Sequence, residues 1–141
     1  MKIFLDTSSL FKLYYKEADT PVIENIFRTN KIDEIFISEL TVIEFASTVW
    51  KKIRTREITD VQAKSITKAF EKDAGKYSMV HISNAIIEEA KMLMANYGLQ
   101  GLRTLDSIQF AVARALITTA DLFITSDTLL QSFFIQEGLP V

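Results

Sequence analysis

Residues 3–9 read Ile-Phe-Leu-Asp-Thr-Ser-Ser, so that one acid, Asp6, directly follows a short apolar run and precedes three hydroxyl residues. Residues 122–127, Leu-Phe-Ile-Thr-Ser-Asp, end in the same way at Asp127. Short apolar runs bounded by polar residues are typical of strands that are buried on both faces of a parallel sheet. The carboxyl ends of parallel strands share one edge of the sheet, where ligands bind. We therefore expect both acids at that edge.

The rest of the chain alternates short apolar runs with segments of helical periodicity, one of which opens with the capping-box sequence Thr59–Gln62. Strands are expected at about 2–6, 35–37, 79–82 and 122–125. Helices are expected at about 9–16 (capped by Ser8 or Ser9), 21–29, 39–54 (capped by Ser38), 60–72, 84–97, 105–118 (capped by Thr104) and 128–136. This alternation predicts one α/β domain over residues 1–141, with a small, mostly parallel sheet sandwiched by helices.

The composition excludes several classes of chemistry. The chain has no cysteine and one histidine, His81, which rules out disulfides, zinc–thiolate sites, thiol catalysis and multi-histidine metal sites. His81 lies in an apolar run without a visible partner, so we expect a structural role for it. No phosphate-binding glycine loop is present. With 16 basic and 18 acidic residues, the chain is not expected to coat nucleic acid through bulk charge, but a local basic rim around an acidic centre fits this balance.

No apolar run approaches the roughly 20 residues of a membrane span. The first residues, Met-Lys-Ile-Phe-Leu-Asp, are too few and too soon interrupted by charge to form a signal peptide. We therefore expect a soluble, cytoplasmic protein without a membrane partner.

Two more acids, Glu44 and Asp106, stand in apolar surroundings. Taken singly, each of the four acids has a structural explanation. Asp127 can cap a helix, and Asp106 falls in a first helical turn, where the macrodipole favours negative charge. Glu44 follows Thr41 at capping-box spacing, and Asp6 can form an Asx turn. Taken together, semi-buried carboxylates at one edge repel each other unless a cation lies between them, which predicts a site for a hard, oxygen-loving divalent metal.

The order of these acids along the chain resembles that of the PIN-domain ribonucleases. The resemblance rests on Asp6-Thr7-Ser8 after the first strand, Glu44 in the helix after the second, Asp106 at the start of a late helix, and Thr125-Ser126-Asp127 after the last main strand. The segment Leu105–Asp127 carries the closest match. The resemblance covers essentially the whole chain, whose length is most similar to the VapC toxins of type II toxin–antitoxin pairs. Ser126 departs from many relatives, which have Asn or another residue there.

The resemblance implies a PIN-like three-layer α/β/α fold and an Mg²⁺- or Mn²⁺-dependent endoribonuclease that hydrolyses RNA phosphodiester bonds. It implies that Asp6, Asp106 and Asp127 bind metal, and that Glu44 is a further ligand or a base that orients the attacking water. It also implies a toxin role, an antitoxin protein as partner, and a homodimer.

Five further residues are candidates for supporting roles. Thr7 and Thr125 are expected to hold carboxylates by hydrogen bonds. Lys51, Lys52 and Arg103 are candidates for contacts with RNA phosphates around the acidic centre. A solvated basic face near a helix C-terminus is the alternative explanation for the lysines.

Other functions are weighed against the toxin. One is a PIN-domain nuclease of RNA maturation or decay that has no antitoxin. Another is a catalytically silent PIN module that serves as a protein- or RNA-binding scaffold, although such a scaffold has no reason to keep four mutually repelling acids. A phosphatase of the haloacid dehalogenase type is excluded, because it needs Asp-x-Asp where this chain has Asp6 and Ser8. A receiver domain is excluded because the acidic pair that it needs near its start is absent.

Overall fold

The computed structural model describes all 141 residues. Its sheet has four strands, β1 (Lys2–Leu5), β2 (Glu34–Ser38), β3 (Ser78–Val80) and β4 (Leu122–Ile124), in the order β3-β2-β1-β4. All three strand pairings are parallel. The predicted sheet is confirmed, and because every pairing is parallel, all four carboxyl ends lie on one edge.

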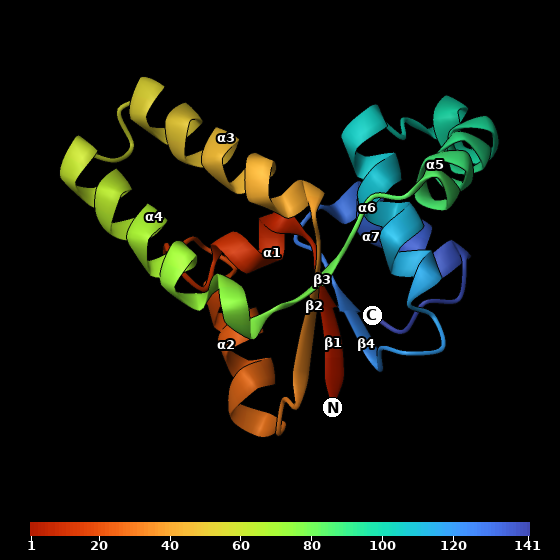
Figure 1. The fold of residues 1–141 in the computed structure, drawn as a ribbon, viewed down its shortest axis with the longest axis horizontal. Helices are drawn as coiled ribbons and strands as arrows, with labels where there is room; N and C mark the ends of the chain where they lie inside the picture. Colours follow the sequence, from red (N-terminus) through yellow and green to blue (C-terminus); the bar gives the residue numbers. More distant parts are fainter.

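Helices cover both faces of this sheet, as expected of a three-layer α/β/α fold. They are α1 (Thr7–Phe11), α2 (Thr20–Thr29), α3 (Leu40–Arg54), α4 (Asp60–Asp73), α5 (Asn84–Tyr97), α6 (Thr104–Ala115) and α7 (Thr128–Gln136), with 3₁₀ turns at Ala74–Lys76 and Gly98–Gln100. Helices α1 to α4 lie on one side of the sheet, and α5 to α7 lie on the other (Figure 1). None of these helices has the length and apolar character that a bilayer crossing demands.

The two faces of the sheet bury two separate cores, because successive strand residues point to opposite faces. Phe4 and Phe123 pack with α5, α6 and α7. Their neighbours Ile3 and Leu5 pack with α1 to α4. The apolar runs that predicted buried strands therefore contribute side chains to both cores. The sheet, with its carboxyl edge, is held between two packed layers of helices.

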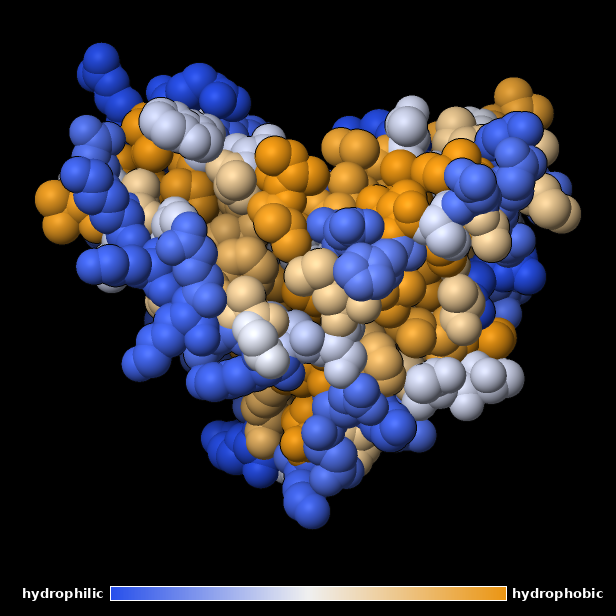
Figure 2. Space-filling view, viewed as in Figure 1, coloured by the Kyte–Doolittle hydropathy of each residue, from blue (hydrophilic) through white to orange (hydrophobic).

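Helices α3 and α4 form an arm, called here the α3–α4 arm (residues 40–73), which extends away from the sheet (Figure 1). A notch separates this arm from α5 and α6. Hydrophobic residues lie on the walls of the notch, and hydrophilic residues follow the outer edge of the arm (Figure 2). The notch opens at the carboxyl edge of the sheet, which is where the sequence placed the acids.

Most element boundaries agree with the sequence predictions, including the capping box, in which the Thr59 hydroxyl accepts from the Gln62 amide at 3.2 Å. The first helix differs. Its cap is Asp6 rather than Ser8 or Ser9, and it ends at Phe11 rather than near residue 16. The carboxylate takes the cap because it is the first acceptor after the strand and, being charged, accepts amide hydrogen bonds more strongly than a hydroxyl does.

Three other expectations are wrong in detail. Glu39 rather than Ser38 occupies the cap position of α3, although the Ser38 hydroxyl accepts from the Leu40 amide at 3.1 Å. Helix α6 ends at Ala115 rather than near residue 118, and Arg103 rather than Thr104 occupies its cap position, without a side-chain cap bond. His81 is not a buried structural residue: its side chain is 79% exposed and lies 3.6 Å from Glu39. The reason is that β3 ends at Val80, so His81 already belongs to the connecting loop.

Helix α3 offers a test of how the arm is held. Phe45 is 2% exposed and stacks on Phe70 of α4 at 4.1 Å between ring centroids. We expect Phe45→Ala to lower the free energy of unfolding by about 3–5 kcal/mol, because it leaves a cavity between two helices. Trp50→Ala on the same helix is the matched control, with an expected change within about 0.5 kcal/mol, because Trp50 is 62% exposed. Urea denaturation measures both, and equal losses would contradict this account of the arm.

Candidate active site

The four acids predicted from the sequence line one cavity of about 410 Å³ at the carboxyl edge of the sheet. Asp6 follows β1 and Asp127 follows β4, while Glu44 comes from α3 and Asp106 from α6. The sheet and the two helices that flank the notch thus bring together residues that are up to 121 positions apart in the chain.

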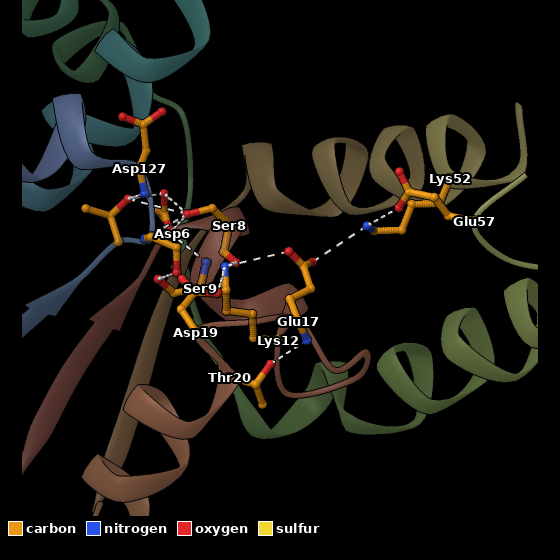
Figure 3. A network of polar contacts seen from close by, with 12 residues as sticks. Asp6, Ser8, Ser9, Lys12, Glu17, Asp19, Thr20, Lys52, Glu57 and Asp127 are labelled. Carbon is orange, nitrogen blue, oxygen red and sulfur yellow. Dashed lines mark hydrogen bonds and ion pairs between the residues drawn. The ribbon is translucent and has the colours of Figure 1, made fainter. Parts of the chain in front are cut away.

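Asp6 is the most deeply buried of the four acids, with 5% of its surface exposed. Its carboxylate accepts hydrogen bonds from the Ser9 backbone amide at 2.9 Å, the Thr125 hydroxyl at 2.6 Å and the Ser8 hydroxyl at 2.8 Å. Figure 3 shows this cluster where β1 and β4 end, with Asp127 beside it. Burial raises the pKa of the Asp6 carboxyl, and the bonds from Thr125, Ser9 and Ser8 oppose that rise. The predicted role of Thr125 as a support for a carboxylate agrees with this contact.

Glu44 is held by donors from two other elements. Its Oε1 accepts from the Gln109 amide at 2.7 Å and from the Thr7 hydroxyl at 2.9 Å, so Thr7 also contacts a carboxylate as predicted. The Gln109 amide nitrogen is also 3.1 Å from the hydroxyls of Thr7 and Thr41. Gln109 is therefore the centre of a buried polar cluster that fixes one oxygen of Glu44 and leaves the other without a protein donor.

Gln109 was missed in the sequence, although a signal for it exists. It is the one strongly polar residue of the run Ile108–Ala113 and is only 2% exposed. A buried amide needs hydrogen-bond partners, and three residues after Asp106 it shares a helix face with that acid. Its Oε1 has no partner in the protein.

Asp106 and Asp127 face the cavity from opposite sides of the carboxyl edge. Asp127 caps α7 by accepting from the Leu130 amide at 2.8 Å. Asp106 lies in the first turn of α6 and is 3.3 Å from Arg103. Burial raises the pKa of Asp106; the Arg103 guanidinium opposes this rise, and the charge of Asp127 adds to it. The structural explanations for Asp106 as a first-turn residue and for Asp127 as a cap are thus correct, whereas Asp6 caps α1 instead of forming the expected Asx turn. In each case these roles account for only part of the carboxylate, because capping uses a single acceptor.

The donor set fits a hard divalent cation. Glu44, Asp106 and Asp127 each keep one carboxylate oxygen that makes no hydrogen bond within the protein. No three acids, however, lie close enough together to form a ready-made cage around an ion. Such an open set suits Mg²⁺, which takes only one or two protein carboxylates and completes its shell with water and phosphate oxygens.

The basic residues predicted near the site differ in their availability. Lys52 is not free: its side chain is 14% exposed, pairs with Glu57 at 2.9 Å, and lies 4.9 Å from the centre of the Tyr15 ring. Arg103 is engaged with Asp106. Lys51 is exposed and makes no ion pair, so it alone keeps an unengaged ammonium group among the three.

A second buried lysine, Lys12, was not singled out in the sequence. It lies behind the cavity, where its ammonium group donates to the Ser8 carbonyl at 3.2 Å and pairs with Asp19 at 3.2 Å (Figure 3). Because Ser8 also contacts Asp6, this lysine braces the turn that carries the buried acid. Its partners lie within seven residues along the chain, but the turn after α1 brings them together, and no helical or strand period indicates such a contact.

The raised pKa of Asp6 carries a prediction about stability in metal-free buffer. The native state holds this proton more tightly than the unfolded chain, whose pKa is near 3.8, so the charged carboxylate lowers stability at neutral pH. We expect Asp6→Asn to unfold at the same or a higher temperature than the native sequence at pH 7. The midpoint should rise by about 2–4 °C for each kcal/mol of destabilisation that the buried charge causes. The difference in unfolding temperature should vanish as the pH falls through the native pKa of Asp6 to below 3.8, because the carboxyl is then uncharged in both the folded and the unfolded state.

Asp6→Ala is the control, because alanine removes the cap and the acceptors together, whereas asparagine still caps. It should unfold at a lower temperature than either of the other proteins in calorimetric melts. A large loss of stability in Asp6→Asn would instead mean that the charge itself holds the turn.

Comparisons with known proteins agree with this fold. Solved structures of similar fold include VapC20 of Mycobacterium tuberculosis, a sarcin–ricin loop cleaving toxin (TM-score 0.69, 16% identity, 93% of this chain and 94% of that one). They also include the FitAcB structure from Neisseria gonorrhoeae (TM-score 0.69, 15% identity, 99% and 95%) and VapBC2 from Rickettsia felis bound to a promoter DNA fragment (TM-score 0.58, 14% identity, 90% and 88%). No curated protein matches the chain at a significant level of sequence similarity. The model of the PIN domain matches residues 3–133, and the chain therefore belongs to the PIN-domain family.

Proposed function

We propose that this PIN domain is a metal-dependent endoribonuclease and the toxin of a toxin–antitoxin pair. The observation that carries the proposal is the single cavity lined by Asp6, Glu44, Asp106 and Asp127. A pure scaffold gains nothing from four acids around one cavity, since burial raises the pKa of Asp6 and of Asp106, and the charge of Asp127 adds to the rise at Asp106.

The toxin role is supported by the kind of protein that shares this fold. VapC20 of M. tuberculosis is a sarcin–ricin loop cleaving toxin by its description, and another similar structure is a toxin–antitoxin complex from Klebsiella pneumoniae. Both cover most of this chain at 16–17% identity. We infer from this likeness an antitoxin protein as the partner. A homodimer stays the expectation that the resemblance to VapC toxins implies.

Asp6, Asp106, Asp127 and Glu44 are the residues that would hold Mg²⁺ or Mn²⁺. When bound, such a metal lowers the pKa of a water molecule and neutralises the charge that builds up on the phosphate during attack. Asp106 and Asp127 each offer an oxygen that the protein leaves unpaired, and Asp6 lines the same cavity.

The protein itself orients the groups around the reacting phosphate. Gln109 and Thr7 fix Oε1 of Glu44, which directs its other oxygen toward the cavity, where it can bind metal or accept a proton from the attacking water. Thr125 and Ser8 fix Asp6 in the same manner. Lys51, one turn beyond Ser47 and Thr48 of the cavity wall, is placed to contact an RNA phosphate.

The ribonuclease is tested with a labelled pool of transfer and messenger RNA incubated with Mg²⁺, Mn²⁺ or EDTA. We expect cleavage that needs metal and that falls by at least about two orders of magnitude in Asp106→Asn, because an amide is a poor ligand for a hard cation. Glu88→Gln makes the same chemical change on the far surface of α5 and should cleave like the native sequence. Cleavage that persists in EDTA, or that is unchanged in Asp106→Asn, would contradict the assignment.

The toxin role is tested separately by controlled expression in bacterial cells. We expect the native sequence to arrest growth, Asp106→Asn to permit it, and co-expression of a small DNA-binding protein encoded just upstream to relieve the arrest. Colony counts and culture density measure the effect. Metal-dependent cleavage in vitro combined with normal growth would favour a nuclease of RNA maturation or decay without an antitoxin.

A further inference from the structure

The basic residues of the chain are unevenly paired. Of the 16 lysines and arginines, eight form ion pairs with acidic side chains and eight do not. Six of the unpaired residues belong to the α3–α4 arm, and all are exposed: Lys51, Arg54, Arg56, Lys64, Lys68 and Lys72. An exposed cation without a partner can neutralise an anion without breaking a contact in the protein. The arm is therefore the surface of the molecule most available to a polyanion.

This availability is not a consequence of overall charge. The arm carries seven basic and five acidic residues, and one of these acids is Glu44 of the active site. The rest of the chain carries nine basic and thirteen acidic residues. A polyanion approaching the acidic cavity is thus attracted on one side only, along α3 and α4.

A groove of about 690 Å³ lies between the two helices of the arm. Trp50 of α3 lines this groove, and its large apolar indole side chain is 62% exposed. Lys64 and Lys68 of α4 also line the groove. They are four residues apart and therefore lie on one face of the helix, where their like charges repel. The acids of the groove, Asp60 and Glu71, flank these lysines by about one turn on either side. The middle of the groove is therefore aromatic on one wall and basic on the other.

This combination matches the chemistry of single-stranded nucleic acid. Unpaired bases stack on exposed aromatic rings, while the phosphates follow a row of cations. A duplex conceals the faces of its bases and offers only phosphates. An apolar peptide would use the indole but would leave both lysines without partners, so the charges favour a nucleic acid strand over a protein segment.

The groove is also adjacent to the active site along α3. Ser47 lines the catalytic cavity, and Trp50 lies one turn further along the same side of α3. From Glu44 to Trp50 the helix rises about 9 Å, which an RNA strand spans within a few nucleotides. Lys51 lies beside this path.

We propose that the groove between α3 and α4 binds a single-stranded segment of the RNA substrate, with a base stacked on Trp50 and phosphates held by Lys64 and Lys68. The inference rests on the ribonuclease function proposed above. It assigns the recognition of unpaired RNA to the arm and leaves the chemistry to the cavity.

The sole tryptophan of the chain makes a direct test possible, because all tryptophan fluorescence comes from Trp50. The Asp106→Asn protein, which does not cut, is titrated with a fluorescein-labelled single-stranded RNA of about a dozen nucleotides. We expect saturable quenching of Trp50 together with a rise in RNA anisotropy. Trp50→Ala should weaken binding by about fivefold or more. The double change Lys64→Gln/Lys68→Gln should weaken it and reduce the salt slope of log K by about 1.4.

The matched control is Lys16→Gln/Arg28→Gln, which removes the two unpaired basic residues outside the arm and should leave affinity and salt slope unchanged. Equal affinity in the two double variants would overturn the inference. So would quenching by duplex RNA as strong as that by single strands, or quenching by a partner protein but not by RNA. If the native protein cuts RNA while the fluorescence of Trp50 stays unquenched, the ribonuclease function stands and the proposed binding of RNA in the groove is refuted. If the protein neither cuts nor binds RNA, both proposals are refuted.

Discussion

The structure depends on the burial of one carboxylate, that of Asp6, at the edge of the sheet. A charged group in that position is costly unless donors surround it. The donors come from separate parts of the chain: the Ser9 amide from the first turn of α1, and the Thr125 hydroxyl from the end of β4, 119 residues away. The pairing of β1 with β4, which sets Leu5 opposite Ile124, brings them together. The contact that makes the acid tolerable therefore also fixes the register of the central strands.

Helix α3 shows how one element serves three purposes through its periodicity. Glu44 faces the cavity, Phe45 faces the core beside Phe70, and Trp50 faces the groove toward α4. Adjacent residues on a helix point about 100° apart, so consecutive positions enter different environments. The rigidity that Phe45 supplies to the arm consequently also fixes where Glu44 stands, and packing on one face determines chemistry on another.

The sequence predicted the fold well where a local pattern decides the outcome. Buried strands, the capping box at Thr59 and the start of α7 after Asp127 follow from residues within a few positions of one another. Asp6 and Asp127 were found because strand ends share an edge in a parallel sheet, and Glu44 and Asp106 because they stand in apolar surroundings. The structure places all four on one cavity. Whether they bind metal stays a prediction.

What the sequence did not disclose depends on partners that are remote along the chain. Lys52 was taken as a phosphate contact, yet Glu17, 35 residues away, engages it, in addition to the nearby Glu57. Gln109 was overlooked because its acceptors Thr7 and Glu44 lie 102 and 65 residues away. Such pairs form only after the helices have packed, so propensity and periodicity carry no information about them.

The distribution of charge joins these observations into one argument about the active site. An acidic centre repels the polyanion that it is proposed to cut, and the chain as a whole has a net charge of −2. Cations placed inside the cavity would solve this but would neutralise the carboxylates, as Arg103 partly does for Asp106. The arrangement observed here separates the two requirements. The acids are held by neutral donors such as Gln109, Thr7 and Thr125, which stabilise charge without cancelling it. The unpaired cations stand on the neighbouring arm, close enough to attract a strand and far enough away to leave the carboxylates available to a metal.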